Sequence, residues 1–286
     1  MTGDRASILR KPEWLKVKLP KGFKASQVVG CLNSRGLHTI CSSGMCPNKG
    51  ECWGNGTATF MIGGGICTRN CKFCNVTSGK PQSLRTEEID DIIKSIKELN
   101  LRHVVITSVD RDDLPDYGSE HWTKMAHAVK KECPGVTMEL LVPDFRGKTE
   151  LFDPLIEIKP EVISHNLETV RRLTPEVRSV ATYTTSLDVL RYISKKGIRT
   201  KSGIMLGLGE RREEILETMD DLLEAGCEVM TIGQYLQPSR QHYPVKEYIH
   251  PDVFEEYREI GKKKGFRHIE SHPLVRSSYH AEKHVN

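Results

Sequence analysis

The sequence predicts an α/β protein built around a parallel sheet. From Thr57 onward, short runs rich in β-branched and apolar residues alternate six times with segments whose apolar residues recur at helical spacing. Such alternation is typical of a parallel sheet with right-handed crossover connections. The length that remains is short for a closed eight-unit barrel, which usually takes about 250 residues. We therefore expect a partial barrel of six strand–helix units, with an open doubly wound sheet as the alternative.

The first expected strand, residues 57–62 (TATFMI), is followed by a cysteine-rich loop and then by an amphipathic helix over residues 87–100. Thr86 is the expected N-cap of this helix. The five later strands are expected at 103–108, 136–142, 162–167, 200–206 and 229–235, and the later helices at 119–132, 149–158, 187–196, 211–225 and 251–264. In such folds the binding loops follow the carboxyl ends of the strands, so we expect the chemistry at that end.

The chain is expected to have three parts. Residues 1–57 contain prolines and glycines at positions 12, 20, 22, 30 and 36, which predict an irregular N-terminal extension. Residues 58–265 are expected to form the barrel, and residues 266–286 a polar C-terminal tail.

Composition excludes several classes of protein. The net charge is +4, from 42 Lys and Arg against 38 Asp and Glu, and no long basic block is present, so we expect no nucleic-acid partner. No stretch approaches the roughly 20 apolar residues of a membrane helix, so we expect no membrane partner. The polar residues 1–10 have no apolar signal-peptide core, which predicts a cytoplasmic protein, with a trimmed organellar protein as the alternative. The absence of heptads favours a monomer.

Six of the nine cysteines lie between Cys41 and Cys74, and such tight spacing in a cytoplasmic protein indicates metal rather than disulfides. Cys67, Cys71 and Cys74 form a CxxxCxxC pattern directly after the first expected strand. Three thiolates on a short loop can hold three corners of a 4Fe–4S cluster, which leaves the fourth iron open for a substrate. A structural zinc site is the alternative, but it usually needs four protein ligands, and the loop supplies three.

Cys41, Cys46 and Cys52 form a second triplet, CxxxxCxxxxxC, in the N-terminal extension. A second iron–sulfur cluster and a structural zinc site completed by His38 are the two interpretations. The scattered cysteines 31, 133 and 227 are interpreted as ordinary residues, the last two as small buried hydrophobes.

The CxxxCxxC loop after the first strand of a partial barrel, with Phe73 before its last cysteine, resembles the radical S-adenosylmethionine (SAM) superfamily. This resemblance implies a partial (β/α)6, TIM-like barrel. It also implies that the open iron binds the amino and carboxylate groups of SAM. One electron from the cluster then splits SAM to methionine and a 5′-deoxyadenosyl radical, which abstracts hydrogen from an unactivated carbon.

Longer motifs make the resemblance more specific. The segments CPNKGECW, TATFMIGGGICTRNCKFCNV, VVITSVDRDDL, HNLETVRRLTPEVR, KSGIMLGLGE, TIGQYLQPS and LVRSSYH are similar to lipoyl synthases. That family inserts two sulfur atoms, at C6 and C8, into an octanoyl chain attached to a lysine of a carrier protein. The resemblance implies that the cluster on Cys41, Cys46 and Cys52 donates the sulfur. It further implies that a serine of the RSSY segment completes this cluster, Ser278 in preference to Ser277.

Four residues are the expected contacts of SAM. The backbone of Phe73 is expected at the adenine, Asn166 and Glu168 at the ribose hydroxyls, and Arg178 at the carboxylate. For Glu168 and Arg178 the alternative is an exposed, charged helix face. Arg276, Ser277 and Tyr279 are further candidates for the active site, with a plain polar tail as the alternative.

The expected partners follow from the same resemblance. They are octanoylated lipoyl-carrier domains or the glycine-cleavage carrier protein, an electron donor such as flavodoxin or ferredoxin, and an iron–sulfur assembly or carrier protein. Two other functions remain open on the sequence alone. One is a different sulfur-inserting radical SAM enzyme, of the biotin synthase or methylthiotransferase type, and the other is a non-catalytic zinc or iron–sulfur module.

Overall fold

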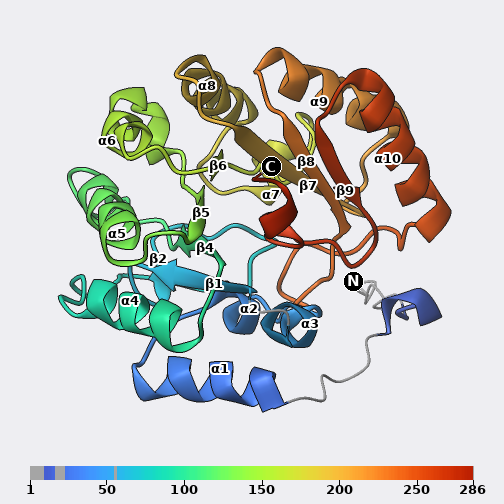
Figure 1. The fold of residues 1–286 in the computed structure, drawn as a ribbon. Helices are drawn as coiled ribbons and strands as arrows, with labels where there is room; N and C mark the ends of the chain where they lie inside the picture. Colours follow the sequence, from blue (N-terminus) through green and yellow to red (C-terminus); the bar gives the residue numbers. More distant parts are fainter. Residues whose placement is uncertain (1–9, 17–22, 55–56, 286) are drawn as a thin grey trace.

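A computed structural model of the chain describes residues 10–16, 23–54 and 57–285. Seven strands form one parallel sheet in the order β1-β4-β5-β6-β7-β8-β9, so β1 and β9 are its two edges (Figure 1). The strands are β1 (Thr57–Ile62), β4 (His103–Ser108), β5 (Thr137–Leu141), β6 (Val162–Ser164), β7 (Thr200–Leu206), β8 (Val229–Gln234) and β9 (His268–Ser271). The sheet is a barrel that does not close, which confirms the expected partial barrel.

One strand was not expected. All six expected strands are present, but β9 adds a seventh, paired in parallel with β8 from Val229↔His268 to Ile232↔Ser271. Its sequence, HIES, is short and has a single apolar residue, and only Ile269 and Ser271 are buried. Such a short run has no clear β-strand signal, so the sequence assigned it to the tail.

Helices cover the outer face of the sheet (Figure 1). They are α4 (Glu88–Glu98), α5 (Ser119–Glu132), α6 (Asp153–Glu157), α8 (Tyr183–Lys195), α9 (Arg212–Glu224) and α10 (Pro251–Lys264), with the short α7 (Thr174–Val177) before α8. The expected cap Thr86 is wrong, because α4 begins one residue later, after Glu87, without a side-chain cap. The helix expected over 149–158 is divided into a 3₁₀ turn, η3 (Thr149–Phe152), and α6, which begins just before Pro154. Two other short 3₁₀ turns, η1 (Glu13–Leu15) and η2 (Phe145–Gly147), lie in loops.

The N-terminal extension is not irregular. It contains α1 (Phe23–Ser34), α2 (Ile40–Ser43) and α3 (Lys49–Gly54), which lie beside β1 (Figure 1). Val28, Leu32 and Trp53 are at most 4% exposed and pack into the same core as the strands. Gly30 does not break α1, because burial of one helix face outweighs the cost of a single glycine, about 1 kcal/mol. The predicted breaks at positions 20 and 22 lie outside the described residues.

The interior of the barrel holds a fully buried ion pair. Lys201 Nζ of β7 lies 2.9 Å from Glu139 Oε2 of β5, and both side chains are 0% exposed. Ser164 Oγ of β6 donates to the other carboxylate oxygen at 2.8 Å. Two further short strands, β2 (Ile66–Cys67) and β3 (Thr77–Ser78), pair with each other and bracket the cysteine loop. No helix in the described part of the chain is both long and apolar enough to cross a membrane.

The C-terminal segment runs from β9 toward α2 and α3 (Figure 1). Asn48 Nδ2 donates to Leu274 O at 2.5 Å, and the Tyr279 hydroxyl donates to Glu51 Oε1 at 3.2 Å. The last 3₁₀ turn, η4 (Ala281–Lys283), precedes His284, whose side chain is fully buried. The tail therefore connects the open edge of the barrel to the N-terminal helices.

Gly233 of β8 allows the tail to approach. A Cβ added there would lie 2.1 Å from Val275 O, a separation that side chains do not tolerate. We expect Gly233→Ala to destabilise the protein by about 1–3 kcal/mol, the usual cost of overpacking. Anaerobic thermal unfolding measures the effect. Gly30→Ala is the control, because an added Cβ there meets nothing within 4 Å and alanine favours the helix. Equal melting temperatures for Gly233→Ala and the parent would contradict the prediction.

Candidate active site

A cavity of about 410 Å³ opens at the carboxyl ends of the strands. The three parts of the chain all contribute to its walls. Among the predicted site residues, those that line it are Cys67, Cys71, Phe73, Cys74, Asn166, Glu168, Arg178, Arg276 and Ser277. The cavity therefore collects the first cysteine triplet, every expected SAM contact and part of the tail.

The first triplet lies in the loop that follows β1. All three of its cysteines are free thiols in this structure. Burial raises the pKa of Cys67 to about 12 and that of Cys74 to about 11, and the neighbouring cysteine charges add to both shifts. Thiols with pKa values this high stay protonated at pH 7, but a thiol loses its proton when its sulfur binds iron.

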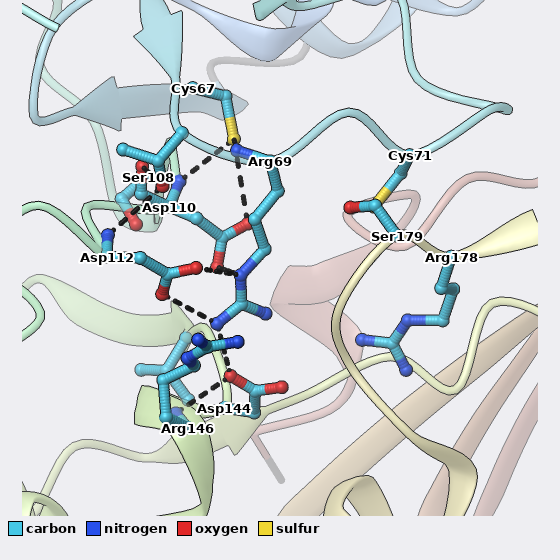
Figure 2. Close-up of polar contacts among 12 residues, drawn as sticks. Cys67, Arg69, Cys71, Ser108, Asp110, Asp112, Asp144, Arg146, Arg178 and Ser179 are labelled. Carbon is cyan, nitrogen blue, oxygen red and sulfur yellow. Dashed lines mark hydrogen bonds and ion pairs between the residues drawn. The ribbon is translucent and has the colours of Figure 1, made fainter. Parts of the chain in front are cut away.

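An arginine inside this loop is held by three carboxylates. Arg69 Nε and Nη2 form a two-pronged contact with Asp112 at 2.8 and 2.9 Å (Figure 2). The Arg69 Nη2 atom also lies 2.6 Å from Asp144 Oδ1, and Nε lies 3.3 Å from Asp110 Oδ1. Burial alone would raise the pKa of Asp144, but the hydrogen bond and charge of Arg69 lower it to about 2. For Asp110, burial dominates and raises the pKa.

The second triplet lies across the cavity on and between α2 and α3. Burial raises the pKa of Cys46, and it raises that of Cys52 to about 12; Cys41 adds to both shifts. The three thiols are therefore close enough to interact. Gly44 and Met45, between the first two cysteines, line the cavity.

The tail reaches the second triplet from the other side. The positive charge of Arg276 opposes the rise in the pKa of Cys46, and the charge of Cys52 adds to the rise in the pKa of Tyr279. Ser277 and Ser278 lie between these two residues, and Ser277 is the one found in the cavity wall. The tail therefore lies against the segment of the second triplet, where Tyr279 donates to Glu51, the neighbour of Cys52.

The geometry disfavours single zinc ions. Zinc needs its sulfur ligands about 2.3 Å from one point. Among the residues that the structure describes, no three His, Cys, Asp or Glu side chains converge in this way. His38 instead lines a separate cavity of about 150 Å³ beside Gly63, Gly64 and Gly65. Thiolates around a cluster each bind a different iron, so they need not converge on one point.

The expected ribose contacts lie where β6 meets β7. Glu168 adopts a left-handed conformation, with φ of 68°, and pairs with β7 through Glu168 N to Gly203 O at 2.9 Å. Burial raises the pKa of Glu168, while Arg178 and a hydrogen bond from Asn166 oppose the shift. The Asn166 Oδ1 atom is buried without a hydrogen-bond partner in the described structure. Such an orphaned acceptor is costly unless a ligand supplies a donor.

Arg178 belongs to a short hydrogen-bond chain. Its Nη1 donates to Ser186 Oγ at 2.8 Å, and Ser186 lies 2.9 Å from His165 Nε2. The other ring nitrogen of His165 lies 2.9 Å from Val142 O. Burial lowers the pKa of His165 to about 4, so the ring is neutral at pH 7. We infer that Nδ1 carries the proton toward Val142 O and that Nε2 accepts from Ser186, which orients Arg178.

Two glycines in and just after β7 allow close packing within the protein. An added Cβ at Gly203 would lie 2.3 Å from Thr231 Oγ1. At Gly207 it would lie 2.2 Å from Gln234 Nε2. These glycines therefore give room to neighbouring protein groups.

The sequence analysis missed several polar residues of the cavity. Arg69, Asp110 and Asp144 were not singled out, although two of them line the cavity and all three are linked. The available signal was the opposite charge of the acidic TSVDRDD segment, which follows an expected strand, and of the one arginine in the cysteine loop. Asp144 had no such signal, because its contact depends on how β5 ends.

Comparisons with known proteins agree with this geometry. Residues 61–222 match the radical SAM superfamily. The chain is 62% identical to the lipoyl synthase of Treponema denticola over 276 residues, which covers 96% of this chain and 95% of that protein. It is 59% identical to the lipoyl synthase of Porphyromonas gingivalis, covering 98% and 100%. It is 56% identical to the mitochondrial lipoyl synthase of Nematostella vectensis, covering 96% and 95%.

Solved structures share the fold at low identity. Methylornithine synthase superposes with a TM-score of 0.58 at 14% identity, covering 75% of this chain and 71% of that one. SuiB of Streptococcus suis bound to S-adenosylmethionine gives a TM-score of 0.59 at 12% identity, covering 76% and 50%. The sequence identities, over nearly the full length of each relative, place the chain in the lipoyl synthase family of the radical SAM superfamily.

Proposed function

We infer that this protein is a lipoyl synthase, a radical SAM sulfurtransferase that inserts two sulfur atoms at C6 and C8 of an octanoyl group on a lysine of a protein substrate. The observation that carries the inference is one cavity walled by the first cysteine triplet, by Gly44 and Met45 of the second triplet's segment, and by Arg276 and Ser277 of the tail, in a chain of this family. Biotin synthase-type enzymes and a non-catalytic zinc module are disfavoured by the family membership.

Enzymes of this family use two 4Fe–4S clusters and SAM. We propose that Cys67, Cys71 and Cys74 hold the cluster that binds SAM. When bound, this cluster supplies the electron that cleaves SAM, while the protein orients the cofactor and excludes water. The loop offers three thiols to the cavity and no fourth ligand of its own, which fits an iron left open for SAM.

We propose that Cys41, Cys46, Cys52 and Ser278 hold the sulfur-donating cluster. The hydrogen bonds from Tyr279 to Glu51 and from Asn48 to Leu274, which join the tail to the segment that carries Cys46 and Cys52, support a place for Ser278 beside the triplet. Arg276 and Tyr279 would then position this ligand, while Ser277 would line the cavity. A serine oxygen is a harder ligand than thiolate and should leave iron more readily. Ser278→Cys is therefore expected to slow sulfur release, and full product formation by that variant would count against this role.

The SAM contacts are also proposals. Asn166 and Glu168 would bind the ribose hydroxyls, which would satisfy the orphaned Asn166 Oδ1. Phe73 would meet the adenine through its backbone, and Arg178 would pair with the SAM carboxylate.

We expect Arg178→Gln to weaken SAM binding by about 10–100-fold, because a charge-assisted hydrogen bond contributes roughly 1.5–3 kcal/mol. Equilibrium binding of SAM to the reconstituted protein measures the loss. Arg172→Gln, on an exposed arginine that pairs with Glu214 outside the cavity, is the matched control. Unchanged affinity in Arg178→Gln would remove this residue from the SAM site.

We further propose the finer partners and the location. The substrate would be an octanoylated lipoyl-carrier domain or the glycine-cleavage carrier protein. The electron donor would be a flavodoxin or ferredoxin, and an iron–sulfur carrier would rebuild the consumed cluster. A cytoplasmic monomer fits nine cysteines that are all unpaired. In the proposed division, residues 1–57 carry the sulfur-donating cluster, residues 58–265 the SAM chemistry, and residues 266–286 the closing ligand.

The test is a direct assay. The protein is reconstituted anaerobically with iron and sulfide, supplied with reductant, SAM and an octanoyl-lysyl peptide, and its products are followed by mass spectrometry. A peptide that gains two sulfur atoms, together with 5′-deoxyadenosine, supports lipoyl synthesis. 5′-Deoxyadenosine without sulfur insertion points to another substrate. Neither product, from protein shown to hold both clusters, contradicts the function.

A further inference from the structure

Arg69 is a buried cation within the loop of the first cysteine triplet. Its side chain is 4% exposed, and its three carboxylate partners come from the segments after β4 and β5 (Figure 2). A buried guanidinium is costly unless it is paired and its N–H groups are satisfied. The two-pronged contact with Asp112 and the further contacts with Asp110 and Asp144 meet that requirement. The loop is thus fixed to two strand ends through one side chain.

The same segments reach the sulfur of Cys67. The backbone N–H groups of Arg69 and Asp110 lie 3.4 and 3.3 Å from Cys67 Sγ. Thr68 Oγ1 donates to Asp110 O at 2.9 Å and accepts from Asp112 N at 3.0 Å. Asp110 and Asp112, two of the three carboxylates that hold Arg69, therefore belong to the segment that donates to the sulfur, and Asp144 ties the same guanidinium to the end of β5. The contacts of the guanidinium and the two N–H···S contacts thus share the same backbone segments.

A positive charge near an iron–sulfur cluster and N–H···S hydrogen bonds to its sulfurs both raise its reduction potential. The reduction potential of an iron–sulfur cluster depends on its net charge, on hydrogen bonds to its sulfurs and on its exposure. Gaining an electron makes the cluster more negative, so a nearby cation and N–H donors favour the reduced form. Nearby carboxylates favour the oxidised form, and charges in a buried site act more strongly than in water.

We propose that Arg69 is a positioning residue that fixes Cys67 against the ends of β4 and β5, and that its charge, set against Asp110, Asp112 and Asp144, raises the reduction potential of the SAM-binding cluster. This inference rests on the proposed role of Cys67 as a ligand of that cluster. Arg69 would thus make it easier for the cluster to accept an electron, which is a role distinct from binding SAM or the octanoyl chain.

The experiment compares two substitutions with opposite expected signs. Arg69→Met removes the cation and should lower the midpoint potential, whereas Asp112→Asn removes an anion and should raise it. The full chain is reconstituted anaerobically and titrated with EPR detection, and the signal of this cluster is identified by its change when SAM is added. At a fixed solution potential, a tenfold change in the ratio of reduced to oxidised cluster corresponds to a shift of about 59 mV in the midpoint potential.

Lys72→Met is the matched control. Lys72 belongs to the same loop and carries the same charge, but it is exposed, so solvent and salt should screen its effect. We expect its potential to stay at that of the parent protein. A shift as large as that of Arg69→Met would mean that loop charge alone, and not the buried network, sets the potential, which would overturn the proposal.

The other possible outcomes also support or overturn the proposal about Arg69. Opposite shifts in Arg69→Met and Asp112→Asn support the proposal, and shifts in the same direction, or none, overturn it. If Arg69→Met fails to hold the cluster, Arg69→Lys replaces it: lysine keeps the charge but not the two-pronged contact, so a smaller fall is expected. Loss of the signal in Cys71→Ala verifies the ligand assignment separately. If the signal survives in Cys71→Ala, the assignment of the ligands fails and the inference about Arg69 fails with it.

Discussion

Cys71→Ala is expected to abolish the formation of 5′-deoxyadenosine. Two thiolates remain on the loop after this change, which is too few to hold a cluster with one open iron. The second triplet is untouched, so the iron content should fall from about eight to about four per chain. Iron analysis and quantification of 5′-deoxyadenosine in the reconstituted protein measure both effects.

Cys133→Ala is the matched control for this prediction. Cys133 is 6% exposed and follows α5, away from both triplets, so its loss should leave both clusters and SAM cleavage in place. Retention of 5′-deoxyadenosine formation in Cys71→Ala would show that this cysteine is not a ligand. A fall to near zero iron would instead mean that the two clusters assemble together, and the independence of the two sites would be wrong.

Ser278→Ala is expected to separate the two halves of the reaction. SAM cleavage should persist, because the first triplet is intact, while lipoyl product should fall by at least about tenfold. Removing a residue that hydrogen-bonds to a metal ligand typically lowers metal affinity or activity about 10–100-fold. Removing a ligand itself should lower them at least as much. Mass spectrometry of the octanoyl-lysyl peptide gives the product, and 5′-deoxyadenosine from the same reaction gives the cleavage.

Ser277→Ala is the matched variant, since it removes the same hydroxyl one position earlier. Ser277 lies in the cavity wall, and the proposal assigns it no iron, so most of the product should remain. If Ser277→Ala loses the product and Ser278→Ala keeps it, the two serines exchange roles. If both keep it, the tail does not supply the ligand.

Local sequence signals predicted the strands and most helices because each is encoded within a short window. Residues 57–62, 103–108 and 200–206 have the predicted bounds. β9 lacked such a signal, because HIES becomes a strand only through the exposed edge of β8. The N-terminal helices were missed for a related reason: Gly30 and Gly36 outweighed the apolar face of α1 that is visible only once the barrel core is known.

The candidate site shows the same division. The cysteines could be found because their spacing is local, and Arg178 because its motif is familiar from the family. The partners of Arg69 could not be paired from sequence, since Asp112 and Asp144 come from different strand ends that only the sheet order brings together. The neutral His165 was likewise hidden, because its state depends on burial and on Ser186.

The contacts of the tail with α3 set an order for biosynthesis. Asn48 and Leu274 are 226 positions apart, and Glu51 and Tyr279 are 228 apart. The loop of the first triplet closes on itself within a few residues, with Gly79 N donating to Cys67 O at 2.9 Å. Because the ribosome synthesises a chain from its N-terminus, the loop of the first triplet can form before residues 274–279 of the tail have been made. We therefore expect nascent chains to expose the second triplet until residues 274–279 have left the ribosome, so that its iron is loaded after that point.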